Sequence, residues 1–292
     1  VLLEIPEGST GNPNQAMQAM ATAGASIVMI KETPQLRSAW PNMAARRITY
    51  TVTSTSAKPF ALVVLNNDAA AAVSALAEGT KIEFSGTLAP AEIRQTWNAI
   101  GKLTGADPRS GVVVISSHLD HVGVRESEPG ADKIFNGADD DASGTVAVME
   151  LARTLAAGKR PKRTVYFVCF GSEESGGLGS NYFAGNMPFP KEDLIANLQF
   201  EMIGRPDPKV KPEELWLTGY ERSNLGPELA RRGAKIVQDP HPTQNFFQRS
   251  DNYTLARQGI IAHTVSSFGL HTDYHRPSDE IKTIDFVHMT RS

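Results

Sequence analysis

Histidine and carboxylate side chains, with which proteins bind zinc, gather in several short segments of the chain. In HLDHVG (118–123), His118 and Asp120 are two residues apart, so on an extended chain they lie on the same side. A histidine that binds zinc usually has an acidic partner that orients its ring. We therefore expect His118 to bind a metal and Asp120 to fix the orientation of the His118 ring.

Three adjacent aspartates stand in the next such segment, NGADDDASG (136–144). Carboxylates are favoured at the start of a helix, so ordinary capping could account for them. Three together repel one another, however, and a bound dication relieves that repulsion. The triplet therefore indicates a metal ligand, without showing which aspartate provides it.

A pair of adjacent glutamates, Glu173 and Glu174, follows in GSEESGG (171–177). If this pair is enclosed, it needs a countercharge. At a zinc site two neighbouring carboxylates suit different tasks, one as a ligand and the other as the general base for the attacking water. The pair therefore predicts both a ligand and a base.

The last such segment, HTDYHRPSDE (271–280), contains His271 and His275. The two histidines would lie one turn apart on a helix, but Pro277 favours a loop. We expect one metal ligand from this loop.

Most of these groups come directly after predicted strands. The strands are continuous apolar runs, typical of strands buried on both faces of a parallel sheet. In open α/β sheets, functional groups collect beyond the carboxyl ends of the strands. Each motif alone has an ordinary explanation as a surface loop, a helix cap or a solvated pair. Their coincidence at three successive strand ends predicts one site beyond strands 111–117, 164–170 and 194–200, the last followed by Glu201.

Strands and helices alternate from Thr96 onward, which predicts an α/β fold with a mostly parallel mixed sheet sandwiched by helices. Further predicted elements are helices over 143–158 and 223–233 and strands over 214–219 and 259–265.

The first part of the chain has its own short elements and predicts a smaller α/β domain. We expect it to cover residues 1–92, followed by a catalytic domain over 93–292. Its predicted helices cover 14–25 and 68–79, and its predicted strands cover 26–30, 47–54, 60–66 and 81–88.

The composition of the 292-residue chain is ordinary, with 40% hydrophobic residues and a formal net charge of −3. This balance gives no reason to expect nucleic acid or an anionic membrane as partner, and no apolar run is long enough to span a bilayer. The single cysteine, Cys169, excludes an internal disulfide and is expected to be a buried apolar residue. Oligomeric state is not indicated.

Taken in order, the motifs HLDHVG, GADDDASGT, GSEESGGLGS, EMIGR and DYHRPSD resemble those of metallopeptidase family 28, the co-catalytic zinc aminopeptidases. The resemblance covers about residues 95–292 and implies a zinc-exopeptidase (phosphorylase/hydrolase-like) fold. Residues 12–90 resemble a protease-associated domain, which we expect to be incomplete. Peptide substrates and a secreted or periplasmic location are implied as well.

The resemblance also assigns the site residues of a centre with two zinc ions per chain. It implies that Asp140 bridges the two ions and that Glu173 is the general base. The Asp140–Asp141 peptide bond would be cis, and Asp251 is a further candidate. The remaining roles are His118 and Glu201 for one zinc, Glu174 and His275 for the other, Asp120 beside His118, and Tyr274 for the tetrahedral intermediate.

Two departures from the family pattern affect these expectations. Many members have aspartate in place of Glu201, and the chain ends at Ser292, inside what resembles the closing helix of the family. We therefore expect that both ends of the natural chain are missing. A one-zinc glutaminyl cyclase, a carboxypeptidase and a non-catalytic binding protein remain as alternatives.

Overall fold

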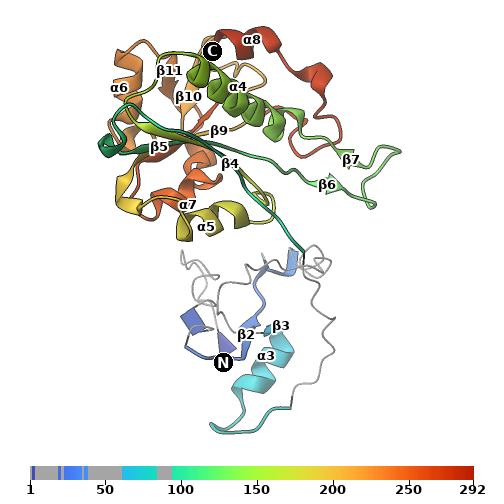
Figure 1. Cartoon of the computed structure of the whole chain (residues 1–292). Helices are drawn as coiled ribbons and strands as arrows, with labels where there is room; N and C mark the ends of the chain where they lie inside the picture. The colour runs from blue at the N-terminus through green and yellow to red at the C-terminus, as the bar shows by residue number, and fades with distance from the viewer. Residues whose placement is uncertain (1, 4–18, 21–22, 35, 39–60, 84–93) are drawn as a thin grey trace. The chain divides into compact units, whose positions relative to one another are not determined.

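The computed structural model describes residues 2–3, 19–20, 23–34, 36–38, 61–83 and 94–292 (Figure 1). By its internal contacts the chain divides into two units, Val1–Ile93 and Arg94–Ser292. This division lies next to the boundary expected between residues 92 and 93.

The N-terminal unit contains a small parallel sheet in the order β1-β2-β3. Its elements are β1 (Leu2–Leu3), β2 (Ile27–Lys31), β3 (Ala61–Leu65) and helix α3 (Asn67–Ser74), which is capped by the Asn66 side chain. The strands expected at 26–30 and 60–66 and the helix at 68–79 are therefore present, with shifted ends. The strand at 47–54, most of the helix at 14–25 and residues 84–88 lie outside the described residues. The protease-associated assignment stays a prediction.

The second unit is built on a seven-stranded mixed sheet in the order β11-β10-β12-β9-β5-β8-β4. Neighbouring strands are parallel except at the pairs β4–β8 and β10–β12. The strands are β4 (Ala99–Leu103), β5 (Val112–His118), β8 (Thr164–Phe170), β9 (Leu194–Phe200), β10 (Leu215–Leu217), β11 (Ile236–Gln238) and β12 (Ala262–Ser266). A separate short pair, β6 (Gly123–Val124) and β7 (Ile134–Phe135), stands beside the sheet.

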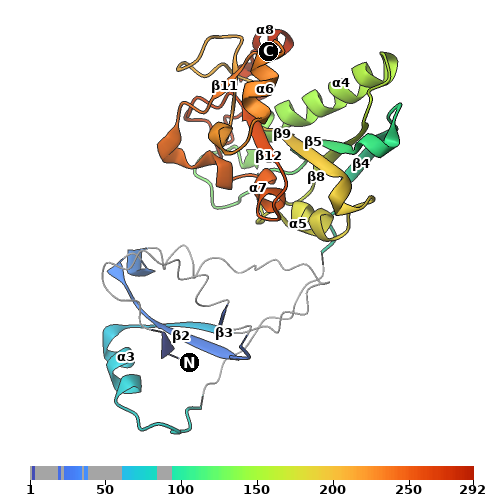
Figure 2. The same cartoon turned by 90° about the vertical axis from the view of Figure 1, so that its left-hand side faces the viewer.

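Helices cover both faces of this sheet, as expected for the fold class. Figures 1 and 2 show α4, α6 and α8 on one face and α5 and α7 on the other. Their bounds are α4 (Gly144–Ala157), α5 (Leu178–Gly185), α6 (Leu225–Arg231), α7 (Asn252–Ala256) and α8 (Phe286–Arg291).

Strand β8 shows why the sequence folds this way, because all seven of its residues are buried. Side chains alternate between the two faces of a strand. Phe170 packs against Phe183 of α5, whereas Phe167 and the buried Cys169 pack on the side of Val148 of α4. Each fully buried large apolar side chain contributes about 1.5–3 kcal/mol, so the central strands are held rigidly where the site begins.

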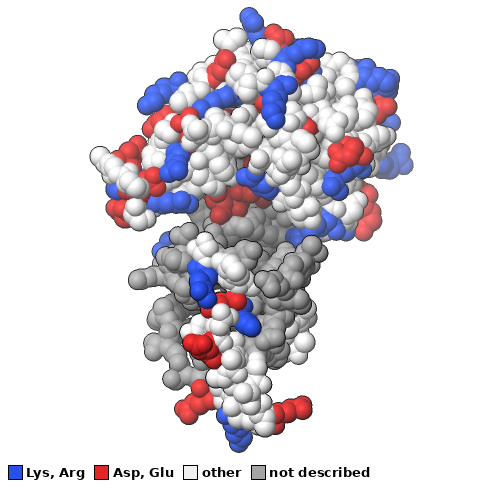
Figure 3. All heavy atoms as spheres, turned by 180° about the vertical axis from the view of Figure 1, so that it is seen from behind, with Lys and Arg blue, Asp and Glu red and all other residues white. Residues whose placement is uncertain are grey.

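Charged side chains are mixed over the surface of the second unit. On the face that Figure 3 shows, lysine and arginine alternate with aspartate and glutamate. Among the described residues, none of the helices has the length and apolar character needed to cross a bilayer.

Candidate metal centre

Three neighbouring parallel strands deliver the candidate site residues to one edge of the sheet. Strand β5 lies between β8 and β9, so the carboxyl ends of all three meet there. β5 ends at His118, the segment after β8 carries Glu173 and Glu174, and Glu201 directly follows β9. The expected convergence of these groups is present.

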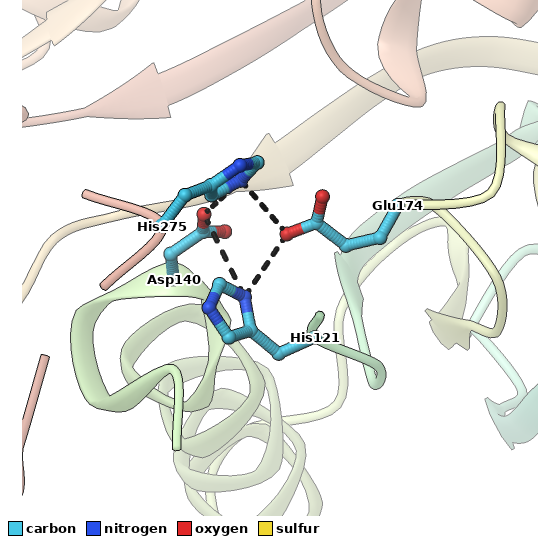
Figure 4. A group of neighbouring side chains, drawn as sticks. All are labelled: His121, Asp140, Glu174 and His275. Atoms are coloured by element: carbon cyan, nitrogen blue, oxygen red, sulfur yellow. Dashed lines mark ion pairs between the residues drawn. The ribbon is translucent and has the colours of Figure 1, made fainter. Parts of the chain in front are cut away.

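Two groups of potential metal ligands lie at this edge and share Asp140. In each group, one ligand atom from every residue lies within 4.8 Å of the others. The first group is His118, Asp140 and Glu201, and the second is His121, Asp140, Glu174 and His275 (Figure 4).

The carboxylate of Asp140 is placed between the two groups. Asp140 Oδ1 lies 3.2 Å from His118 Nε2, and Asp140 Oδ2 lies 3.2 Å from His275 Nε2. Tetrahedral zinc with bonds of about 2.0–2.1 Å has ligand atoms roughly 3.3–3.4 Å apart. The spacing therefore suits one carboxylate oxygen for each of two zinc ions.

The polar atoms facing this space fit a cation. His118 Nε2 and Glu174 Oε1 are buried and lack hydrogen-bond geometry, although charged partners lie 3.0–3.2 Å away. Buried polar atoms without hydrogen bonds are costly. Imidazole nitrogens and carboxylate oxygens are the donors that zinc takes, so the residues present fit that metal.

The two outer aspartates of the triplet have structural roles. Asp141 accepts hydrogen bonds from the backbone N–H groups of His118, Gly144 and Met202, each at 3.1 Å. Asp139 accepts from the backbone N–H of Gly204 at 2.7 Å. The Asp140–Asp141 peptide bond is cis, as the resemblance implies. These bonds leave Asp140 as the aspartate that faces the site.

The two histidines of the last motif contact different carboxylates, and Asp139 binds one of them. Its Oδ2 lies 2.8 Å from His271 Nε2, whereas His275 points at Asp140 and Glu174. One histidine of this loop is thus a candidate ligand, and the other holds the acidic turn (Ala138–Ser143).

Asp279, which the sequence analysis did not identify, holds the acidic turn through hydrogen bonds to its backbone. This fully buried carboxylate accepts hydrogen bonds from the backbone N–H groups of Asp139 and Asp140 at 3.0–3.1 Å. Its Oδ1 also pairs with the guanidinium of Arg205 at 3.1 Å. The side chain therefore fixes the backbone that presents Asp140.

Asp120 does not orient the His118 ring through its side chain as expected. His118 Nδ1 lies 2.9 Å from the main-chain oxygen of Asp120, and the nearest Asp120 carboxylate oxygen is 4.0 Å away. The carboxylate instead accepts the backbone N–H groups of Glu173 at 2.8 Å and Glu174 at 3.2 Å. The reason is geometric: the chain turns after β5 and directs the carboxylate toward the segment after β8.

Burial has a strong effect on the carboxylates of Glu173 and Glu201. Burial, reinforced by the charge of Glu201, raises the pKa of Glu173 to about 10. Burial also raises the pKa of Glu201 to about 7, against the opposing effect of His118. A dication in their midst would favour the ionised forms of both carboxylates.

In the second ligand group, the pKa of a carboxylate is lowered and the pKa of a histidine is raised. Burial opposes ionisation of Glu174, but the imidazoles of His121 and His275 outweigh it and lower the pKa of Glu174 to about 2. Burial likewise disfavours the charged form of His275, but Asp140 and Glu174 outweigh it and raise the pKa of His275 to about 9.

The remaining candidates border the site. The Tyr274 ring stacks on His275, with centroids 4.0 Å apart, and burial raises its pKa to about 12. Asp251 is buried, and that burial raises its pKa to about 6. His121 is a residue that the sequence analysis missed, although it stands in the same HLDHVG motif as His118.

Comparison with curated proteins finds peptidases that match parts of this chain. Leupeptin-inactivating enzyme 1 from Streptomyces exfoliatus is 38% identical over 114 residues, which are 38% of this chain and 24% of that enzyme. Probable leucine aminopeptidase 2 from Aspergillus oryzae is 29% identical over 177 residues, 58% of this chain and 33% of the fungal protein. The matches thus span less than half of these relatives.

Solved structures share the fold. An aminopeptidase from Aneurinibacillus sp. strain AM-1 has a TM-score of 0.54 at 21% identity, covering 99% of this chain and 65% of its own. A zinc aminopeptidase from Bacillus subtilis has a TM-score of 0.52 at 20% identity, covering 92% and 61%. A glutaminyl cyclase from Porphyromonas gingivalis has a TM-score of 0.51 at 20% identity, covering 66% and 72%.

The family comparison covers the whole site. Residues 98–291 match the model of peptidase family M28, and this range includes every residue of both ligand groups. The fold and the motif order agree with this match, and the chain belongs to peptidase family M28.

Proposed function

We propose that the protein is a di-zinc aminopeptidase that removes N-terminal residues from peptides. The observation that carries this proposal is the placement of Asp140, whose two oxygens face two different groups of ligands. Relatives named as aminopeptidases and zinc metalloproteases support it.

In this proposal, one zinc is held by His118, Asp140 and Glu201, and the other by Asp140, Glu174 and His275. Bound zinc supplies Lewis-acid chemistry: it polarises the scissile carbonyl and lowers the pKa of water. Glutamate in place of the more usual aspartate is compatible with this role, because Glu201 lies within ligand distance of His118 and Asp140.

Glu173 acts as the general base. The backbone N–H of Glu173 donates a hydrogen bond to the Asp120 carboxylate, and this bond holds the segment after β8 close to the site. Glu173 takes a proton from the attacking water and returns it to the leaving amine. The hydroxyl group of Tyr274, beside His275, donates a hydrogen bond to the developing oxyanion.

A pocket next to Glu201 supplies a place for the substrate side chain. Its lining combines aromatic and polar side chains: Trp216, Phe246, Phe268 and Tyr274 together with Thr218, Arg249, Ser250, Thr264 and Ser266. Trp216 and Phe246 are stacked with their centroids 5.3 Å apart. The aromatic part of this lining favours an apolar N-terminal residue, in agreement with the leucine aminopeptidases among the relatives.

Buried carboxylates lie beside the pocket. Burial raises the pKa values of Glu173, Glu201 and Asp251; the charges of Glu201 and Asp251 raise that of Glu173 further, and the charge of Asp251 raises that of Glu201 further. The choice of an aminopeptidase over a carboxypeptidase rests on the relatives, which are named as aminopeptidases. Secretion or a periplasmic location stays a prediction.

The test is a panel of aminoacyl-4-nitroanilides and short peptides with the zinc-loaded protein. We expect hydrolysis of leucyl and phenylalanyl substrates and no hydrolysis of the same substrates with an acetylated N-terminus. Release of C-terminal residues, or formation of pyroglutamate from N-terminal glutamine without peptide hydrolysis, would refute the proposal.

A further inference from the structure

The imidazole of His121 points into the second ligand group. Its Nδ1 lies 3.0 Å from Glu174 Oε1 and 3.8 Å from Asp140 Oδ2 (Figure 4). The side chain is only 7% exposed, and neither ring nitrogen has a hydrogen-bond partner among the residues that the structure describes. A buried imidazole without a hydrogen bond is costly. The position of this ring is explained if the imidazole binds a metal ion.

The backbone around His121 makes room for the ring. Gly137 adopts a positive φ of 63°, and a Cβ at this position would stand 2.5 Å from His121 Cγ. Any side chain there would push the imidazole away from Glu174. The glycine before the acidic turn therefore permits the close approach of His121.

One ligand atom from each of the four residues of this group lies within 4.8 Å of the other three. His275 Nε2 lies 3.2 Å from Asp140 Oδ2 and 3.0 Å from Glu174 Oε1, and His121 Nδ1 completes the set on the opposite side. The spacings of 3.0–3.8 Å are close to the edges, roughly 3.3–3.4 Å, of a zinc tetrahedron.

The first ligand group differs, because its described members number three: His118, Asp140 and Glu201. Four protein ligands fill the coordination of tetrahedral zinc, whereas three leave one position open for water or substrate.

We propose that His121 is a fourth protein ligand of the zinc held by Asp140, Glu174 and His275, which makes the two metal positions unequal. This inference rests on the proposed di-zinc function and assigns each position a task. The four-ligand position binds its zinc first and more tightly. The three-ligand position loads second and keeps an open place for the reacting groups.

The test titrates the zinc-free protein with zinc in competition with a chromophoric chelator. The key variant is His121→Asn, which keeps a polar side chain beside Glu174 but removes the imidazole ligand. The matched control is His118→Asn, which removes a ligand from the other position. Thermal unfolding of each zinc-free variant shows that it is folded.

We expect His121→Asn to weaken binding of the first zinc by more than ~100-fold, which exceeds the loss caused by an outer hydrogen-bonding partner. His118→Asn should leave the first zinc within ~3-fold of its wild-type affinity and abolish the second, because it changes only the three-ligand group. One equivalent of Co²⁺ should give the intense visible bands of tetrahedral cobalt in wild type and weaker bands in His121→Asn.

The inference is overturned if His121→Asn binds its first zinc within ~10-fold of wild type and shows an unchanged cobalt spectrum, since His121 would then act only through a hydrogen bond. Loss of the first zinc in His118→Asn would overturn it as well. Failure of the wild-type protein to bind any zinc would refute the proposed function together with this inference.

Discussion

The carboxylate of Asp120, two residues after the end of β5, accepts a hydrogen bond from the backbone N–H of Glu173 at 2.8 Å and so positions the proposed base after β8. The neighbouring Glu174 N–H binds the other carboxylate oxygen at 3.2 Å. One side chain thus aligns the base and a candidate ligand together.

Replacing Asp120 with alanine should therefore lower kcat by ~10–100-fold, the range typical of residues that orient a metal site. Asp120→Asn keeps one acceptor oxygen and should lose less. Steady-state kinetics on a leucyl substrate measure both changes. Equal activity of Asp120→Ala and wild type would show that the segment after β8 needs no such support.

Glu173→Gln removes the proposed base but keeps the size of the side chain. We expect zinc content near that of wild type and a fall in kcat of ~10²-fold or more. Glu192→Gln, at an exposed glutamate distant in sequence, is the control. If Glu173→Gln loses zinc together with activity, Glu173 is a ligand and the roles of Glu173 and Glu174 must be exchanged.

Arg205 pairs with two carboxylates of unequal burial, Asp279 at 0% and Asp273 at 26% exposure. Asp279→Asn breaks a buried ion pair and should cost about 3–5 kcal/mol of unfolding free energy. Asp273→Asn affects a more exposed pair and should cost about 1 kcal/mol or less. Urea unfolding of the two variants measures the difference. Similar losses would contradict the claim that Asp279 holds the acidic turn.

Zinc binding should release protons near neutral pH. The carboxylates of Asp140 and Glu174 outweigh burial and raise the pKa of His275 to about 9, so this ligand carries a proton in the metal-free protein at pH 7.5. Zinc must displace that proton, so affinity should rise by about tenfold per pH unit for each proton released, up to about pH 9. Calorimetry in two buffers of different ionisation enthalpy counts the protons. An affinity independent of pH between 7 and 9 would contradict the assignment of His275.

The central strands could be predicted from the sequence because they are buried on both faces. β8 (Thr164–Phe170) and β9 (Leu194–Phe200) have the predicted bounds, since their apolar runs are continuous. Strand β4 (Ala99–Leu103) was missed because it is a mostly exposed edge strand without such a run.

The candidate site could be predicted in part, for a similar reason. Residues at the end of a buried strand or directly after it, such as His118 and Glu201, are placed by the strand itself. The contacts of Asp120 and Asp279 could not be predicted. Both carboxylates bind backbone N–H groups, which nearly every residue has, so no residue type in the sequence indicates these contacts. His121 was overlooked because its approach to Glu174 depends on the turn after β5 and on the space left by Gly137.

The central claim is that Asp140 joins two zinc sites in one chain. Native mass spectrometry of the zinc-equilibrated protein tests this most directly, with Asp140→Ala as the comparison. The account predicts two zinc ions in wild type and a loss affecting both positions in Asp140→Ala, because each oxygen of Asp140 faces a different ligand group. One zinc ion in wild type, or two retained in Asp140→Ala, would contradict it.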